Sequence, residues 1–293
     1  MGRAAWLKRN WGAAGAGLLV LLLGVAFVLG FRPMVETARC PHGLVSLGPR
    51  CCAEGQRLVG GACVGQPRSC PHGFTARTLG CVVNPKKILI RAGNLSSGPA
   101  DWQSPTLAPR TGKLESFELD AFEVTVGAWR DCVGTGGCAA LGSRTIAREP
   151  GQPVTEVTPE QAESYCHRLG GRLPTLSEWM WAAAGAEERR FPWGQTGLVC
   201  RRASFGLIAG PCAEGGQQPE LSGARPDGRT PEGVTDLAGN VAEWARSQMG
   251  HYRALGGSFE SRVAGELSAT AAFDAAAPAR HIGFRCTYPA SQP

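Results

Sequence analysis

The sequence GRLPTLSEW at residues 171–179 contains the strongest secondary-structure signal in the chain. Thr175 can cap a helix, and Glu178, three residues on, can bond back to the cap, which is the capping-box arrangement. Gly185 is a residue type that commonly ends a helix. We therefore predict a short helix between Thr175 and Gly185. Its buried face would consist of the apolar residues that recur at helical spacing, which are Leu176, Trp179, Met180, Ala183 and Ala184.

A second helix is predicted immediately upstream of this segment. Thr158 can cap it, Pro159 would take the first helical position, and Gln161 completes another capping box. The pair Gly170-Gly171 would end the helix. Its apolar residues at helical spacing are Ala162, Tyr165, Cys166 and Leu169.

Shorter elements are predicted farther toward the N-terminus. Residues 88–90 are typical of a strand, and residues 117–121 alternate apolar and polar side chains as a half-buried strand does. Between them, the Gly- and Ser-rich residues 93–98 predict a turn. Thr125 can cap a short helix, which would carry Val126, Trp129 and Cys132.

Length and composition limit the classes of protein that fit the chain. It has 293 residues, of which 43% are hydrophobic and 18% charged, and this composition is typical of one or two globular domains. The 41 glycines, and the Gly- and Pro-rich stretches after Gly194, predict a fold with many loops. The net charge of +6 is modest, and no dense stripe of Lys and Arg with interleaved aromatic residues occurs. Nucleic acid is therefore not an expected partner.

Seven motifs follow one another in order within residues 88–286. They are Phe122-Glu123-Val124-Thr125, Pro153–Val157 with Ala162–Cys166, Gly171–Trp179, Phe191-Pro192-Trp193-Gly194, Asp236–Trp244, Gly256-Gly257-Ser258-Phe259 and Gly283-Phe284-Arg285-Cys286. Together they resemble the motifs of the formylglycine-generating-enzyme (sulfatase-modifying-factor) family. The resemblance implies that family's irregular α+β fold, related to C-type lectin-like domains, over residues 85–293.

The resemblance also implies a disulfide bond between Cys166 and Cys286, because the family pairs the cysteines at these motif positions. Such a bond would close a long loop and so restrict the unfolded chain strongly. The simplest pairs among the other cysteines of this domain each close a short loop. They are Cys132 with Cys138 and Cys200 with Cys212.

Family members that make formylglycine oxidise a cysteine of a sulfatase with copper and oxygen, and two cysteines bind the copper. The resemblance puts these two positions at Ser261 and Glu266, and residues 260–279 contain no cysteine. A hydroxyl group and a carboxylate are not the soft thiolate ligands that Cu(I) prefers. We therefore expect no catalytic residue and no bound copper. His167, His251 and His281 share no metal-ligand spacing, so an iron site like that of the family's sulfoxide synthases is not expected either.

Calcium is the metal that the resemblance implies, in the loop that begins at Asp236. Carried over by position, its ligands would be the Asp236 side chain, the carbonyl groups of Gly239 and Val241, and the Glu243 carboxylate. Ca²⁺ binds about six to eight oxygen atoms, so other groups would have to complete the shell. The alternative is a loop with two solvated carboxylates. A second calcium site of the family has no clear counterpart, because Ser204 stands where an Asn is expected.

Residues 40–83 contain three copies of the pattern Cys-x-x-Gly-x7-Cys. Each copy predicts a small loop closed by its own disulfide bond, and so small a module needs such cross-links because its core is limited. Zinc is the alternative, since His42 and His72 lie beside cysteines, but the usual spacing of zinc ligands is missing. The sequence alone does not fix how the six cysteines pair. They are Cys40, Cys51, Cys52, Cys63, Cys70 and Cys81.

Residues 12–31 form an uncharged, mostly apolar run that is long enough for a transmembrane helix, about 30 Å. Basic residues precede it, so residues 1–11 are expected in the cytoplasm and the rest of the chain in the periplasm or outside the cell. The alternative is a cleaved signal peptide, although the run is longer than a typical signal core. Either form would export the domain to a compartment that allows disulfide bonds.

The function favoured by these observations is that of an exported, membrane-anchored family member that binds or regulates an unknown protein or peptide without catalysis. A first alternative is an oxidoreductase with a different chemistry, which could use Glu260, Glu266, Asp274 and Arg280. A second alternative is a structural envelope protein that makes contacts through the cysteine-rich repeats.

Overall fold

The computed structural model describes residues 44–48, 50–59, 62–70, 74–77, 80–83, 85–97, 110–142, 148–206, 218–275 and 277–291. The predicted membrane segment at residues 12–31 lies outside these ranges. In the described part of the chain, no helix is both long enough and apolar enough to cross a membrane.

Each of the three cysteine repeats contains a two-stranded antiparallel hairpin. Disulfide bonds join Cys52 to Cys63 and Cys70 to Cys81, each within one repeat. The expectation of one bond per repeat is therefore confirmed for the second and third copies, while Cys40 and the side chain of Cys51 lie outside the described part. The strands are β1 (Leu44–Leu47), β2 (Arg50–Ala53), β3 (Arg57–Val59), β4 (Ala62–Val64), β5 (Phe74–Arg77) and β6 (Gly80–Val83).

A three-stranded antiparallel sheet joins the beginning and the end of the larger domain, with strand order β15-β10-β7. Leu119 in the central strand pairs with Ile88 on one side and Thr287 on the other. Ile88 and Ile90 are buried while Leu89 between them is exposed, which is the alternation expected of a strand with one face on the core. Both strands predicted here are confirmed, as β7 (Lys87–Ile90) and β10 (Phe117–Asp120), and they pair with β15 (Thr287–Pro289).

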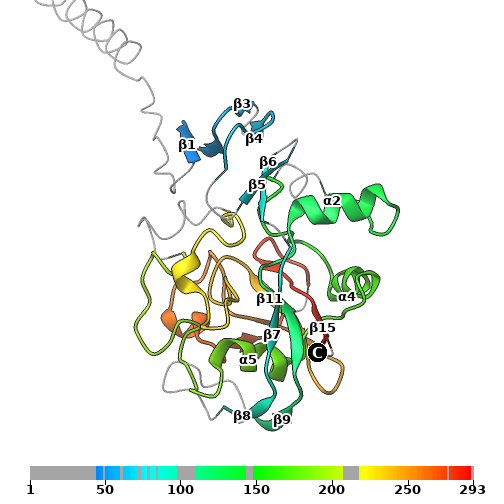
Figure 1. Cartoon of the computed structure of the whole chain (residues 1–293), viewed down its shortest axis with the longest axis vertical. Helices are drawn as coiled ribbons and strands as arrows, with labels where there is room; N and C mark the ends of the chain where they lie inside the picture. Colours follow the sequence, from blue (N-terminus) through cyan, green and yellow to red (C-terminus); the bar gives the residue numbers. More distant parts are fainter. Residues whose placement is uncertain are drawn as a thin grey trace, which may run out of the picture. The chain divides into compact units, whose positions relative to one another are not determined.

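The predicted turn at residues 93–98 is wrong. Residues Gly93–Ser97 form a strand, β8, that pairs with β9 (Arg110–Leu114) in a hairpin lying alongside helix α5 (Leu176–Ala184) (Figure 1). A Cβ atom at Gly93 would lie only 2.1 Å from the ring of Trp181. This glycine therefore makes room for a tryptophan distant in sequence.

All three predicted helices are present. Thr125, Thr158 and Thr175 accept hydrogen bonds from the first turns of their helices, and the last two form complete capping boxes. Leu169, placed at helical spacing in the second helix, is 53% exposed, because the helix ends at Arg168 and Leu169 is already its C-terminal cap. The helices are α2 (Val126–Gly134), α4 (Pro159–Arg168) and α5 (Leu176–Ala184).

A second sheet has the strand order β13-β12-β11-β14, and its β11–β14 pair is parallel. Two short 3₁₀ helices lie in the connecting loops. These elements are β11 (Ala242–Arg246), β12 (Tyr252–Leu255), β13 (Ala272–Phe273), β14 (Ile282–Gly283), η1 (Pro226–Gly228) and η2 (Ala264–Leu267).

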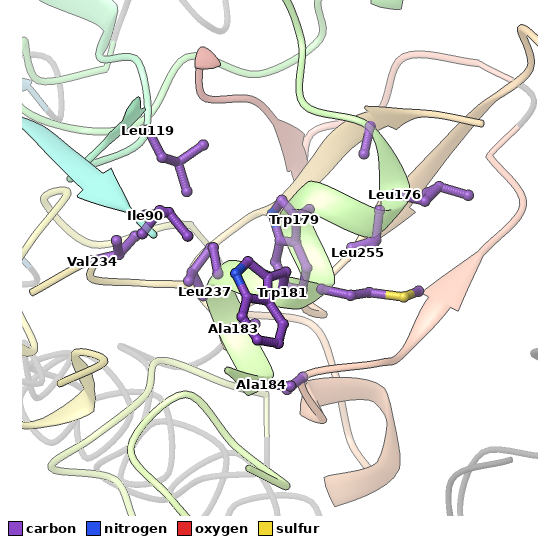
Figure 2. Close-up of a cluster of buried hydrophobic side chains, with 14 of the residues drawn as sticks. Ile90, Leu119, Leu176, Trp179, Trp181, Ala183, Ala184, Val234, Leu237 and Leu255 are labelled. Atoms are coloured by element: carbon purple, nitrogen blue, oxygen red, sulfur yellow. The ribbon is translucent and has the colours of Figure 1, made fainter. Parts of the chain in front are cut away.

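Helix α5 lies at the centre of the main core. Figure 2 shows Trp179 and Leu176 of this helix near Leu255 of β12, with Ile90 and Leu119 of the first sheet in the same cluster. Trp179 is fully buried, so truncating it to alanine would cost about 3–5 kcal/mol. The predicted buried face of this helix is confirmed, and its core supports the loops described below.

Disulfide bonds cross-link elements of this domain, and the bond between Cys166 and Cys286 lies in its core. Cys166 of α4 is bonded to Cys286 just before β15, and Cys132 is bonded to Cys138 at the end of α2, so both predicted pairs are confirmed. Cys200 is also disulfide-bonded, and its predicted partner Cys212 lies outside the described residues.

Candidate functional site

The turn at Gly256–Ser261 is built by close packing around two glycines. Gly256 and Gly257 have φ angles of +84° and +66°, which favour glycine over any other residue. A Cβ atom at Gly256 would lie 2.8 Å from the carbonyl oxygen of Leu237, and one at Gly257 would lie 2.9 Å from Oγ of Ser261. The turn is thereby held against the loop that begins at Asp236.

The two positions predicted to replace copper thiolates each serve the local backbone. The Ser261 hydroxyl is almost buried and accepts a hydrogen bond from the Ser258 amide, 3.0 Å away. Glu266 in η2 is exposed, and its Oε2 accepts from the Arg262 amide at 3.1 Å. No cysteine in the described part of the chain is free. Neither side chain is therefore a soft ligand, and each already has a partner.

Glu243 lies at the centre of a fully buried ion pair. Its Oε1 accepts from Nη2 of Arg285 at 2.6 Å, and its Oε2 accepts from Nε of Arg285 at 2.7 Å. The indole N–H of Trp179 donates to the same Oε2, also at 2.7 Å. Arg285 further donates to the carbonyl oxygens of Asp120 and Thr235. Such a bidentate, fully bonded pair meets the conditions under which a charge can be buried.

Glu123 is a second buried carboxylate, in the connection between β10 and α2. It is 2% exposed, and its Oε2 accepts from the Ser222 hydroxyl and from Nδ2 of Asn240, both at 2.8 Å. Its Oε1 accepts from the Val241 amide at 3.2 Å. Glu123 thus ties the first strand-to-helix connection to the loop of predicted metal ligands.

Asp236 is buried beside this network in a left-handed conformation, with φ of +58°. Its Oδ2 accepts from the Gly223 amide at 2.5 Å. Burial raises the pKa of Asp236 to about 6, and the hydrogen bond from Gly223 only partly offsets this. Burial and the neighbouring charge of Asp236 also raise the pKa of Glu123 well above its usual value.

These contacts test whether the four predicted residues fit calcium. The Glu243 carboxylate is bonded on both oxygens to protein donors, and the guanidinium of Arg285 beside it would repel a divalent cation. Among the described residues, no three His, Cys, Asp or Glu side chains are grouped so that they could hold a metal ion. Glu243 is therefore the counterion of Arg285, and the predicted ligand set does not fit a calcium shell in this arrangement.

Ser204, at the position compared with a second calcium site, lies behind the same loop. Its carbonyl oxygen accepts from the Asn240 amide at 2.8 Å. The Ser204 side chain is 1% exposed, and its hydroxyl has no hydrogen-bond partner within the described ranges. It contributes to packing of the loop rather than to a recognisable ligand set.

The residues proposed for the alternative oxidoreductase do not all lie at one site. Glu260 forms an ion pair with Arg280, and its Oε2 lies 3.1 Å from Nδ1 of His281. Arg280 also lies over the ring of Phe259, 5.6 Å from its centroid. Asp274, in contrast, pairs with Arg253 at 2.9 Å. Glu260 and Arg280 are thus brought together beside the Gly256–Ser261 turn.

Three residues of this region had no predicted role. Glu123 and Arg285 belong to quoted motifs, but nothing in their local pattern indicates buried charges that bond to distant segments. His281 has no spacing signal because its partner Glu260 lies in another loop. The one local sign of a buried charge is that Glu123 follows the half-buried strand by only a few residues, between the apolar residues Phe122 and Val124.

A family model described as "Sulfatase-modifying factor enzyme 1-like domain" matches residues 77–290. A hercynine oxygenase of Mycolicibacterium thermoresistibile is 35% identical over 104 residues, which cover 34% of this chain and 22% of that protein. A bovine (Bos taurus) protein named "Inactive C-alpha-formylglycine-generating enzyme 2" is 35% identical over 102 residues, 33% of each chain. The matched segments thus span less than half of these relatives.

Solved structures support the same fold. The structure titled "Structure of PvdO from Pseudomonas aeruginosa" aligns with a TM-score of 0.58 at 18% identity, and the alignment covers 70% of this chain and 95% of that one. At this level of identity the similarity establishes the fold alone. The predicted α+β architecture of the larger domain agrees with it.

Proposed function

Because the chain belongs to the family of sulfatase-modifying factor enzyme 1-like domains, we propose that it is a non-catalytic member that binds or regulates a protein or peptide partner. The observation that carries the proposal is the chemistry at Ser261 and Glu266. A hydroxyl and a carboxylate replace the two thiolates that copper chemistry needs, and each is bonded to a backbone amide. The helices and sheets of the family's fold are present around them in the described part of the chain.

Two further points support this proposal. A relative whose name describes it as inactive shares 35% identity with this chain over 102 residues, so loss of activity has a precedent among similar proteins. The Glu243–Arg285 pair is a structural bond between two motifs, so the motifs have a role in folding without any reaction. We also propose, from the apolar run at residues 12–31, that the domain is exported and held at the membrane.

The test is an oxidation assay with the purified full-length chain. A peptide from a sulfatase, containing its modified cysteine, is incubated with copper and oxygen, and the product is measured by mass spectrometry. We expect no formylglycine above the level of the protein-free control. A formylglycine-generating enzyme assayed in parallel shows that the peptide and conditions are competent. Turnover by this chain that exceeds the protein-free rate would refute the proposal.

A second candidate function, an oxidoreductase with altered chemistry, is favoured by one observation. Glu260 orients His281 through Nδ1, which leaves Nε2 as an available base or ligand beside the Gly256–Ser261 turn. Metal analysis of the purified chain separates the two candidates. A stoichiometric redox metal that is lost in the His281→Ala variant would favour the oxidoreductase, and its absence favours the binding module.

A further inference from the structure

A cavity of about 800 Å³ lies between the start of β7, the β10–α2 connection, helices α2 and α4, and β15. Small-molecule sites in proteins commonly have volumes of about 300–1,000 Å³, so this cavity is large enough for an organic ligand. None of its described lining residues belongs to the Gly256–Ser261 turn. It is therefore separate from the position at which relatives carry out their reaction.

The walls of this cavity are held in place by covalent and aromatic contacts. Tyr165, which lines it, is stacked on Trp129 at 5.6 Å and meets Phe284 edge-on at 5.5 Å. The disulfide between Cys166 and Cys286 joins the helix of Tyr165 to the strand that carries Tyr288, another lining residue. A ligand would meet a preformed surface, so little ordering would oppose binding.

Several charged residues of the lining already form hydrogen bonds with other protein groups. Glu123 uses both carboxylate oxygens in the buried network described above. Arg130 donates from Nη2 to the carbonyl oxygen of Arg148 at 3.1 Å. Asp120 accepts at Oδ2 from the Cys286 amide at 3.0 Å and from the Tyr288 hydroxyl at 3.5 Å. None of these three is an open partner for a ligand.

Two lysines from the linker remain at the cavity. Lys86 is exposed, and no residue in the described part of the chain pairs with its ammonium group. Lys87 lies with Nζ 3.4 Å from the centroid of the Tyr288 ring. Among the acids of the lining are Asp120, whose charge interacts with that of Lys87, and Asp131 on α2, which is exposed. The linker thus places two ammonium groups at one end of the cavity, and Phe122, Tyr165 and Leu169 supply apolar surface.

We propose that this cavity is a binding site for a small amphipathic organic anion. Its apolar body would lie against Phe122, Tyr165 and Leu169, and its acidic group would face Lys86 and Lys87. This inference deepens the proposed binding role and rests on it only for its biological use, because the cavity does not include the residues that decide whether the chain is catalytic.

The probes are 1-naphthaleneacetate and its uncharged analogue 1-naphthaleneacetamide, titrated into the purified full-length chain by calorimetry. We expect saturable one-to-one binding of the acid and about fivefold weaker binding of the amide, the size expected for an exposed ion pair. Binding of the acid should weaken as salt is added, whereas binding of the amide should not. Equal affinities for acid and amide, or no saturable binding of either, would overturn the proposal.

Substitutions of lining residues test whether the probe binds in this cavity. The double variant Lys86→Gln/Lys87→Gln should lower the affinity for the acid to that for the amide, and the matched control Lys113→Gln, an exposed lysine on β9, should change neither. Ala128→Trp on α2 should fill the cavity and abolish binding of both probes. An unchanged far-ultraviolet circular dichroism spectrum and a cooperative thermal transition show that this variant is folded.

An exposed position provides a second blocking variant in case Ala128→Trp does not fold. Leu169→Glu removes apolar surface from the wall and should weaken the binding of both probes. Unaltered binding in Leu169→Glu, or in a folded Ala128→Trp, would refute the assigned place. A failure of the proposed function is detected separately, as oxidation of the sulfatase peptide, and binding of the naphthalene probes does not depend on that reaction.

Discussion

Arg285 has no exposed surface, and its charge is paired directly with Glu243. Desolvating a guanidinium and a carboxylate is costly, and the cost is recovered only through the two parallel hydrogen bonds and the additional donors and acceptors around them. The pair therefore joins the loop of Asp236–Trp244 to the motif that ends at Cys286. This buried ion pair therefore stabilises the fold.

Removing one member of this pair should be severe. The variant Arg285→Met leaves Glu243 buried without its cation, so we expect the free energy of unfolding to fall by about 3–5 kcal/mol, measured by urea denaturation. Glu243→Gln in the same chain should recover part of that loss, because the amide still accepts from Trp179. The control Lys113→Ala breaks an exposed pair with Glu115 and should change stability little. A loss in Arg285→Met as small as in the control would contradict the assigned role.

Asp120 should make stability depend on pH. Burial raises its pKa from 3.8 to about 6 in the folded chain, so the folded state binds the proton more tightly than the unfolded state does. The stability that this proton contributes is present below about pH 4 and is lost as the pH rises through about 6. The variant Asp120→Asn should be more stable than the parent at pH 7, by up to about 3 kcal/mol, and the difference should shrink toward pH 4. Denaturation series at several pH values measure this, and a constant difference would refute it.

At the scale of elements, the disulfide bonds differ in the length of chain that they close. The Cys166–Cys286 bond spans 120 residues and the Cys132–Cys138 bond spans 6. Chain-entropy reasoning gives a stabilisation of about 5 kcal/mol for the first and about 2 kcal/mol for the second. The first bond also joins α4 to the segment that leads into β15, the last described strand.

We therefore expect a clear order of stabilities among serine variants. Cys166→Ser/Cys286→Ser should lower the urea midpoint more than Cys132→Ser/Cys138→Ser does, because the longer loop restricts the unfolded chain more strongly. Both proteins must be compared at equal pH and oxidation state. If the short-loop variant were the less stable of the two, the entropic explanation would not hold for this domain.

The elements also show what sequence can and cannot predict here. The capping boxes at Thr158 and Thr175 were predictable because all their bonds are made within one helical turn. The strand β8 was not predictable, because Gly93 is required by its close contact with the ring of Trp181, which is far away in the sequence. In the same way, motif positions identified Glu243, but only the fold shows that Arg285 is its partner. Local rules therefore gave the helices, whereas long-range contacts decided the site.

In the whole molecule, hydrogen bonds from protein donors hold the buried carboxylates around the loop at Asp236, so a metal ion is not needed to stabilise it. Glu243 is held by Arg285 and Trp179, and Glu123 is held by three donors. We expect chelation with EDTA to leave the melting temperature of the purified chain unchanged, because protein donors already satisfy these carboxylates. Added calcium should have no effect either. A fall of several degrees on chelation, restored by calcium, would revive the calcium prediction.

We propose that this domain keeps the family's framework without a soft-metal site beside the Gly256–Ser261 turn. The most direct test is anaerobic titration of the folded chain, with its disulfide bonds intact and no thiol reductant present, with Cu(I) in competition with a chromogenic chelator. The parent chain should leave the copper with the chelator, whereas the variant Ser261→Cys/Glu266→Cys should withdraw about one equivalent, since two thiolates suit Cu(I). Stoichiometric, tight Cu(I) binding by the parent chain that is lost when Ser261 is replaced by alanine would contradict the claim.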